Sequence, residues 1–365
     1  MRRRQFLERC GVIVATHTFI NQVPKTATAA GASEDIDEIL PTLVAELMER
    51  HQVPGVSVAV VNDAKLGFHG SFGVSNTDTG EPVDGQTVFE AASLTKPLLA
   101  QTVLKLWEDG AIDLERPLME YREPDTKSAD PKRFHAITPT HVLSHSTGLP
   151  NWHFGKKPVR VRFDPGTQFS YSGMAYVMLQ RVVEQITSLP FEQYLNVNLF
   201  APLEMESAGL VWREDYETRL AYGHSAKGKA SRQSMDEANA ASSLVCSAKD
   251  YATFLKALMD PDANFPLKLK PDTTNRLLTP KRTVRDGIAW GLGWGIQQTS
   301  DGNSYWHWGN NGNRYHAFAV WKRDNRSAVV VMTNSGNGLK LCRDLVPDLM
   351  TGDHPSFDWR MVVGG

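Results

Sequence analysis

The sequence has few cysteines, no long apolar run and no excess of either charge. Only 3 of its 365 residues are Cys, and none forms a Cys-x-x-Cys pair, which excludes a disulfide framework and argues against a zinc or dithiol site. No apolar run approaches the ~18 residues of a membrane-spanning helix. The 39 Lys and Arg against 41 Asp and Glu leave a net charge of −2. Without a basic stripe interleaved with aromatic residues, we expect neither a nucleic-acid partner nor integral membrane association.

The first thirty residues have the composition of an export signal. Three arginines, Arg2 to Arg4, precede Phe6 and Leu7, and a mildly apolar stretch and an Ala-Thr-Ala run follow. This order predicts a signal peptide over residues 1–30, and the Arg-Arg-x-Phe-Leu run resembles a twin-arginine signal. The alternative is a disordered basic tail. We expect an exported protein, periplasmic or secreted, that folds before export.

Removal of this segment would leave two cysteines about a hundred residues apart, Cys246 and Cys342. Free Cys is among the residue types most often buried. We expect two buried thiols, although an oxidising compartment would also permit a bridge.

Patterns typical of strands lie at both ends of the remaining chain. Alternating or β-branched runs occupy residues 56–61 and 66–73, and four more lie beyond residue 287. Helical patterns dominate between about residues 93 and 282. We therefore predict one α+β domain over residues 31–365, an α/β sandwich whose antiparallel sheet is built from both termini with flanking helices. Residues 33–92 and 285–365 would form this part, and a mainly helical lobe of about residues 93–284 would be inserted. A site would lie between the two parts.

The run from Phe89 to Pro97 contains the only Ser-x-x-Lys of the chain, Ser93 and Lys96. Three residues apart, the two side chains share a helix face. Pro97 requires a helix that begins just before it, so Ser93 lies near a helix N-terminus, where developing negative charge is favoured. A buried Lys of lowered pKa can relay a proton. The alternative is a capping Ser with a surface Lys.

Two later segments carry further polar groups. Tyr171 follows a Pro-Gly turn at the start of a helical pattern, where its phenol can enter a crevice or simply pack. His307 and Gly309 fall on one face of a strand, with Trp306 and Trp308 on the other, where core packing is expected. The missing side chain at Gly309 lets a backbone or a ligand approach closely.

In this order, the three segments resemble the serine β-lactamase-like superfamily of class C β-lactamases, D-Ala-D-Ala peptidases and related esterases. The matching motifs are Ser93-x-x-Lys96, Tyr171-Ser172-Gly173 and His307-Trp308-Gly309, with further similarity at residues 137–150, 239–250, 290–294 and 329–334. Two positions depart from the family. Gly173 replaces a common Asn, and His307 replaces the Lys of most dedicated β-lactamases, which weakens recognition of a substrate carboxylate.

The resemblance implies a role for each of these positions. Ser93 would be the acylated nucleophile, and Lys96 with Tyr171 would form its base, through either an ionised phenol or a neutral amine. The oxyanion hole would consist of the backbone N–H groups of Ser93 and Asn310, and His307 would assist by hydrogen bonding.

The remaining candidate residues concern substrate and metal. Gly173, Gly309 and Trp152 would contact substrate. His141 and His145 are four residues apart, but the Glu of a His-Glu-x-x-His site is missing, so we expect no metal and no cofactor.

Three functions remain open. We favour a serine hydrolase that cleaves esters or D-amino-acid peptides through an acyl-enzyme, with a small molecule or a peptide as its partner. A class C-type β-lactamase is the alternative within the same chemistry. A non-catalytic relative that binds peptidoglycan peptides or a protein is the alternative from another class. No feature of the sequence indicates an oligomeric state.

Overall fold

A nine-stranded antiparallel sheet forms the centre of the molecule. The computed structural model describes residues 31–363, so the export signal predicted for residues 1–30 lies outside the described residues. The strand order is β3-β2-β1-β13-β12-β11-β10-β9-β8. The strands are β1 (Gly55–Asn62), β2 (Lys65–Asn76), β3 (Glu81–Pro82), β8 (Arg282–Arg285), β9 (Ile288–Trp290), β10 (Gly295–Thr299), β11 (Gly302–Asn311), β12 (Tyr315–Lys322) and β13 (Ser327–Thr333).

Strands from the two ends of the chain meet in the middle of this sheet. β1 pairs with β13, with Val58 opposite Val331. Successive side chains of a strand point to opposite faces, so Val58 and Val60 enter one hydrophobic core, whereas Ala59 and Val61 enter another. This arrangement confirms the predicted α+β fold with a sheet built from both termini.

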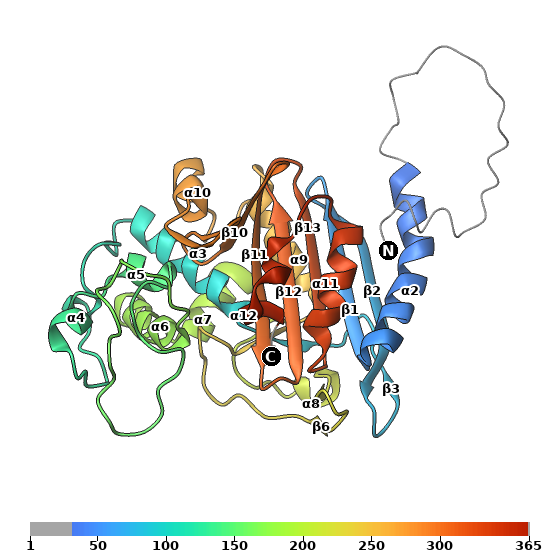
Figure 1. Cartoon of the computed structure of the whole chain (residues 1–365), viewed down its shortest axis with the longest axis horizontal. Coiled ribbons are helices and arrows are strands. Elements are labelled where there is room, and N and C mark those ends of the chain that lie inside the picture. Colours follow the sequence, from blue (N-terminus) through green and yellow to red (C-terminus); the bar gives the residue numbers. More distant parts are fainter. Residues whose placement is uncertain (1–30, 364–365) are drawn as a thin grey trace, which may run out of the picture.

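Helices cover both faces of the sheet. The N-terminal helix α2 (Gly31–His51) and the C-terminal helix α11 (Gly338–Leu349) pack together on one face, and α9 (Ala248–Met259) packs on the other (Figure 1). Residues 248–259 were predicted to belong to the helical lobe, but in the structure they pack on β1 and β13 of the sheet. Every residue of β12 is buried, which requires a cover on both faces. Both terminal helices continue through their prolines, Pro41 and Pro347.

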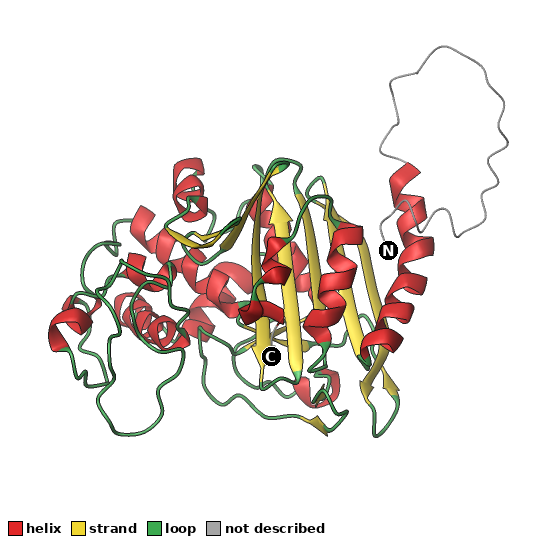
Figure 2. Ribbon diagram, in the orientation of Figure 1, coloured by secondary structure: helices red, strands yellow, loops and turns green. Residues whose placement is uncertain are grey.

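The rest of the chain forms a helical lobe beside the sheet (Figure 2). Short helices and loops make up most of it, and no helix in the described part of the chain has the length and apolar character to cross a membrane. The helical segments of the lobe are α3 (Thr95–Glu108), α4 (Pro131–His135), α5 (Pro139–Leu143), α6 (Gly173–Thr187), α7 (Phe191–Leu195), α10 (Pro271–Leu278) and the turns Leu118–Glu120 and Asn196–Phe200. The short helix α8 (Tyr216–Arg219) lies below the sheet (Figure 1), and Pro355–Asp358 and α12 (Arg360–Val363) follow α11.

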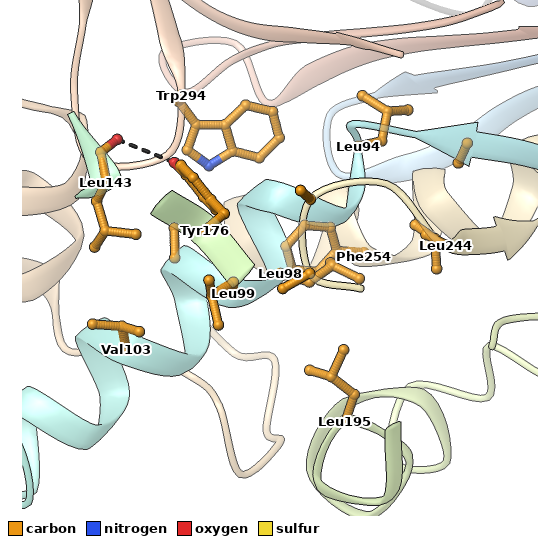
Figure 3. Close-up of a cluster of buried hydrophobic side chains, with 14 of the residues drawn as sticks. Leu94, Leu98, Leu99, Val103, Leu143, Tyr176, Leu195, Leu244, Phe254 and Trp294 are labelled. Carbon is orange, nitrogen blue, oxygen red and sulfur yellow. Dashed lines mark hydrogen bonds between the residues drawn. The ribbon is translucent and has the colours of Figure 1, made fainter. Parts of the chain in front are cut away.

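The buried helix α3 is the centre of this lobe. Leu98, Leu99 and Val103 belong to one core with Tyr176 of α6 and with Trp294, which lies in the connection between β9 and β10 (Figure 3). Burial of each such aliphatic side chain contributes about 1.5–3 kcal/mol. The same core continues onto the α9 face of the sheet, so the helix that follows Ser93 is fixed to both parts of the molecule.

The two cysteines of the described chain are buried free thiols, as predicted. Cys246 lies in β7 (Leu244–Cys246) and Cys342 lies in α11, and both are buried and unbridged. Burial raises the pKa of each thiol, which keeps both protonated and unreactive.

Candidate active site

Ser93 lies in the sharp turn between β4 (Phe89–Ala92) and α3. Ala92 has a φ of 51°, a left-handed conformation that is unfavourable for a residue with a side chain. The hydroxyl of Thr95 stabilises the turn, because it donates to the Ala92 carbonyl at 2.6 Å and accepts the Leu244 N–H at 3.0 Å. The chain therefore holds Ser93 at the N-terminus of a buried helix, as the position of Pro97 predicts.

Lys96 is buried against Ser93, with only 1% of its surface exposed. Its Nζ atom donates to Ser93 Oγ at 2.9 Å and to the Ala241 carbonyl at 2.6 Å. No carboxylate in the described chain forms an ion pair with it. Burial lowers the pKa of Lys96 well below its ordinary value. The neutral amine that this favours can accept the proton of Ser93.

The ring of Tyr171 lies on the other side of the Lys96 amine. Its centroid is 4.8 Å from Lys96 Nζ, and its hydroxyl is buried without a hydrogen-bond partner among the described residues. Burial raises the pKa of Tyr171, and the Ser93 hydroxyl opposes that shift. Ser172 anchors the segment by capping α6, since its Oγ accepts the Ala175 N–H at 3.1 Å. Of the two alternatives for the base, the structure therefore favours a neutral amine over an ionised phenol.

The His145 ring packs against the Tyr171 ring at a tilt. The two ring centroids are 4.1 Å apart, and His145 Nδ1 accepts the Ser172 N–H at 3.1 Å. The sequence analysis considered His145 only as half of a metal pair with His141. Helix α5 ends at Leu143, so the two histidines do not share a helix face. No group of three or more potential metal ligands occurs within residues 31–363.

His307 reaches the site from the sheet and is neutral. It is fully buried, and its Nδ1–H donates to the Trp308 carbonyl at 2.8 Å. Burial lowers its pKa to about 3, and Lys96 would act in the same direction when protonated. Its ring centroid is 6.2 Å from that of Tyr171. Trp306 and Trp308 belong to the core on the other face of the strand, as alternation predicts.

Gly309 allows β11 to approach the strand that leads to Ser93. A Cβ atom at Gly309 would lie 2.3 Å from the Ala91 carbonyl oxygen, so only glycine fits. Pairing of β10 with β11 ends at Trp306, which leaves residues 307–311 without a partner from β10. Asn310 lies on this unpaired edge, and its part in an oxyanion hole with Ser93 stays a prediction.

Trp152 covers the position at which Gly173 lacks a side chain. A Cβ atom at Gly173 would lie 3.0 Å from the Trp152 ring, and the Gly173 N–H donates to Asn151 Oδ1 at 2.9 Å. Trp152 is 39% exposed and, with Met174, lines a cavity of about 290 Å³ in the helical lobe. Ser93, Lys96, Tyr171 and His307 do not line this cavity. Trp152 therefore forms part of the wall of this cavity and is not in the cluster of Ser93, Lys96, Tyr171 and His307.

Two contributors to the site had no side-chain signal in the sequence. The Ala241 carbonyl accepts hydrogen bonds from both Lys96 and Ser93, but a backbone acceptor can be supplied by any residue type. The left-handed conformation of Ala92 could not be predicted from the sequence either, because such positions are recognised by a glycine and this residue is an alanine. The similarity of residues 239–250 to the family was the one signal that pointed to the Ala241 segment.

Comparison with known proteins identifies the family. The family model described as Beta-lactamase matches residues 40–344. Penicillin-binding protein 4* of Bacillus subtilis is 26% identical over 209 residues, which cover 51% of this chain and 45% of that protein. A protein of Pseudomonas fluorescens named Beta-lactamase is 26% identical over 277 residues, covering 71% of this chain and 74% of the relative.

Solved structures agree with this result. The β-lactamase/D-alanine carboxypeptidase of Pseudomonas syringae superposes with a TM-score of 0.74 at 18% identity, over 88% of this chain and all of that one. Matches of this kind show a shared fold. Matches to several curated relatives span only about half of the relative's length. Because the family model matches most of the chain, including the segments of Ser93, Tyr171 and His307, the protein belongs to the Beta-lactamase family.

Proposed function

We propose that the protein is a serine hydrolase that cleaves esters or amides through an acyl-enzyme on Ser93. The observation that carries this function is the 2.9 Å contact between Lys96 Nζ and Ser93 Oγ. A buried lysine of lowered pKa next to a serine hydroxyl is the pairing that nucleophilic catalysis requires. A protein that only binds peptides has no need of it.

Acylation would proceed by transfer of one proton. Ser93 Oγ attacks the substrate carbonyl carbon while its proton moves to the neutral Lys96 amine. The tetrahedral intermediate then expels the alcohol or amine, which takes that proton from Lys96, directly or through the Tyr171 hydroxyl. The products are a released leaving group, an ester between the acyl group and Ser93, and a neutral Lys96.

The negative charge of the intermediate would be stabilised by backbone groups. The N–H of Ser93 and that of Asn310 are the proposed donors, and loss of one such donor typically reduces turnover by about 10²–10³. The approach of Gly309 to Ala91 supports this assignment, because it brings the edge of β11 to the segment that carries Ser93. Water then attacks the acyl-enzyme, again with Lys96 as base, and releases the acid.

Ester and D-amino-acid peptide substrates are favoured over β-lactams. His307 is uncharged near pH 7 because its pKa lies at about 3, so it offers no fixed cation to a substrate carboxylate. The Trp152 ring covers Gly173, where many relatives have a side-chain amide. β-Lactam hydrolysis is the second candidate, supported by the similarity to the Pseudomonas fluorescens protein.

Covalent labelling tests the nucleophile. A fluorophosphonate probe should add its phosphonyl group to Ser93 in the wild type, and Ser93→Ala should remain unlabelled; intact-mass and peptide mass spectrometry give the readout. Failure of the wild type to label across pH 5–9 would favour the binding protein that lacks catalysis. Rates on p-nitrophenyl butyrate, a D-Ala-D-Ala peptide and nitrocefin then rank the substrates. A dominant rate on nitrocefin would overturn the preference for esters and peptides.

We also propose that the protein acts outside the cytoplasm. The support is the Arg-Arg-x-Phe-Leu run of residues 3–7, followed by an apolar stretch and small residues. Replacement of both Arg3 and Arg4 by Lys should abolish appearance of the protein in the periplasm or medium if the twin-arginine route is used. Unchanged export of this variant would exclude that route.

A further inference from the structure

A buried carboxyl group close to Ser93 has no part in the mechanism described above. Glu90 lies in β4, three residues before Ser93, and only 9% of its surface is exposed. No Lys, Arg or His of the described chain forms a salt bridge with it. Its Oε2 atom accepts a hydrogen bond of 2.6 Å from the side-chain amide of Asn311. A carboxyl group buried without a cation is costly to ionise, so its position requires an explanation.

Asn311 connects three segments that carry parts of the site. It follows Asn310, the proposed oxyanion donor on β11, and its amide binds Glu90 on β4. The same amide also donates to the Ser242 carbonyl at 3.1 Å. Ser242 follows Ala241, whose carbonyl accepts from Lys96.

Strand pairing cannot provide this connection. β4 pairs with β7, whereas β11 pairs with β10 and β12, so no ladder of backbone hydrogen bonds joins β4 to β11. The two strands nevertheless lie in contact at Gly309 and Ala91. In the described chain, the hydrogen bond that joins β4 to β11 across this contact is the one between Glu90 and Asn311.

We propose that Glu90 and Asn311 are a positioning pair that holds the Asn310 N–H in place relative to Ser93, and that the pair works best when the Glu90 carboxylate is ionised. The inference rests on the proposed function, since it assumes acylation at Ser93. An ionised acceptor forms a shorter and roughly twofold stronger hydrogen bond than a neutral one. Protonation of Glu90 therefore loosens the contact between β4 and β11 and misplaces the donor, and small misplacements reduce catalysis strongly.

The Glu90 carboxyl group gains and loses its proton near neutral pH. Burial raises its pKa to about 7, and the Asn311 hydrogen bond opposes the shift. On β12 the facing group is Tyr315, whose pKa is also raised by burial and by Glu90 itself. The charges of Arg232 and Arg314 oppose the rise in the pKa of the Tyr315 phenol, but neither arginine forms a salt bridge with Glu90.

The histidines and the cysteine on the strands packed against β4 stay neutral near pH 7, and the lysine on β12 is held in a salt bridge. Burial lowers the pKa of His307 on β11 to about 3 and that of His316 on β12 to about 4. Burial raises the pKa of the Cys246 thiol on β7. Lys322, at the other end of β12, pairs with Asp301 at 2.6 Å. β13 contributes no titratable side chain. Lys96 on α3 also loses its proton below its ordinary pKa, so the step that belongs to Glu90 is the part of the pH profile that Glu90→Gln removes.

The rate at which a fluorophosphonate labels Ser93, measured from pH 5 to 9, tests the pair. The wild-type rate should fall as pH decreases through about 7. Glu90→Gln should lack this step and label on the order of tenfold more slowly at pH 8, because a neutral acceptor holds Asn311 less firmly. Asn311→Ala should also lack the step and label slowly, since the ionised carboxylate then has no side-chain amide on β11 to hold. Glu192→Gln is the control, because this half-buried carboxyl also accepts a hydrogen bond of 2.6 Å, from the Leu210 N–H, but lies on α7.

Thermal unfolding gives a readout independent of labelling. The pKa of Glu90 is higher in the folded protein than its ordinary value of 4.5, so the group favours folding at low pH, and this contribution is lost as pH rises from 4.5 to about 7. Glu90→Gln should remove that part of the pH dependence of Tm. If this variant does not fold, Asn311→Ala still tests the pair.

The two proposals can fail separately. No label on wild-type Ser93 overturns the serine hydrolase. A labelled wild type whose pH profile is shared by Glu90→Gln and Asn311→Ala overturns the positioning pair and leaves the hydrolase intact. Slower labelling of these variants that merely follows the lost folded fraction, with an unchanged pH step, also overturns it.

Discussion

The two halves of the site contribute different things. The helical lobe supplies reactive groups, namely Ser93, Lys96 and Tyr171, and burial shifts the pKa of both Lys96 and Tyr171. The sheet supplies a neutral imidazole at His307 and a bare backbone at Gly309. Under the proposed function, the chemistry would lie on the lobe, whereas the sheet would provide shape and hydrogen-bond donors. Substitutions on the lobe should remove the reaction, and those on the sheet should slow it or redirect it.

The largest effect is expected for Lys96→Met on the lobe. Met has a similar length but cannot accept the Ser93 proton, so acylation should fall by about 10²–10⁴. Single-turnover hydrolysis of p-nitrophenyl butyrate measures it. Because burial lowers the pKa of Lys96, wild-type acylation should rise with pH and reach its plateau well below the ordinary lysine value.

The control is the other lysine of the same helix. Lys105 is partly exposed and pairs with Asp109 at 2.6 Å, so Lys105→Met should retain wild-type acylation. An equal loss in both variants would show that α3 needs its lysines for folding rather than for proton transfer.

The next largest effect is expected for Gly309→Ala on the sheet. The new Cβ would lie 2.3 Å from the Ala91 carbonyl oxygen, so β11 must move away from β4. If Asn310 is an oxyanion donor, kcat should fall by about 10²–10³, and overpacking should reduce the free energy of unfolding by about 1–3 kcal/mol. Steady-state kinetics and urea unfolding provide the measurements. Gly85→Ala, with nothing within 4 Å of its Cβ, should change neither; a normal kcat in Gly309→Ala would show that the sheet does not position the donor.

The sheet was easier to predict from the sequence than the lobe. Alternation placed His307 and Trp308 on opposite faces of β11, and both strands near the N-terminus were found because β-branched runs have a period of two. The prediction that placed residues 248–259 in the helical lobe was wrong, although their helical pattern itself was recognised. Periodicity identifies a helix but not the surface that it covers, so only the topology assigns α9 to the sheet.

The same limit applies to the site. Ser93 and Lys96 were recognisable because their spacing of three has a meaning within a helix. Their partners were not, because Ala241 acts through its backbone and His145 accepts a hydrogen bond from Ser172, 27 positions away in sequence. Glu90 lay inside the first motif, but its partner Asn311 is 221 residues away. Contacts between distant segments leave no local pattern.

A smaller effect, on specificity rather than rate, is expected for His307→Lys. An ammonium group would give β-lactam substrates a fixed partner for their carboxylate, whereas the wild-type imidazole is neutral. The ratio of kcat/KM for nitrocefin to that for p-nitrophenyl butyrate should rise about tenfold, equivalent to about 1.4 kcal/mol. The position is fully buried and near Lys96, which limits the gain. A constant or lower ratio would mean that the sheet does not set carboxylate recognition.

The smallest effect is expected at the boundary between the two halves, where Trp152 covers Gly173. Gly173→Asn would restore the side-chain amide of many relatives, but its Cβ would lie 3.0 Å from the Trp152 ring. Alone it should leave the preference between nitrocefin and p-nitrophenyl butyrate almost unchanged. Combined with Trp152→Ala, which vacates that space, it should raise the relative nitrocefin rate a few-fold, a coupling of about 0.5–1 kcal/mol. Trp152→Ala alone separates the loss of the ring from the gain of the amide. Additive effects in this cycle would show that Trp152 does not occupy the place of the missing amide, and the lobe would then provide reactive groups without contributing to specificity.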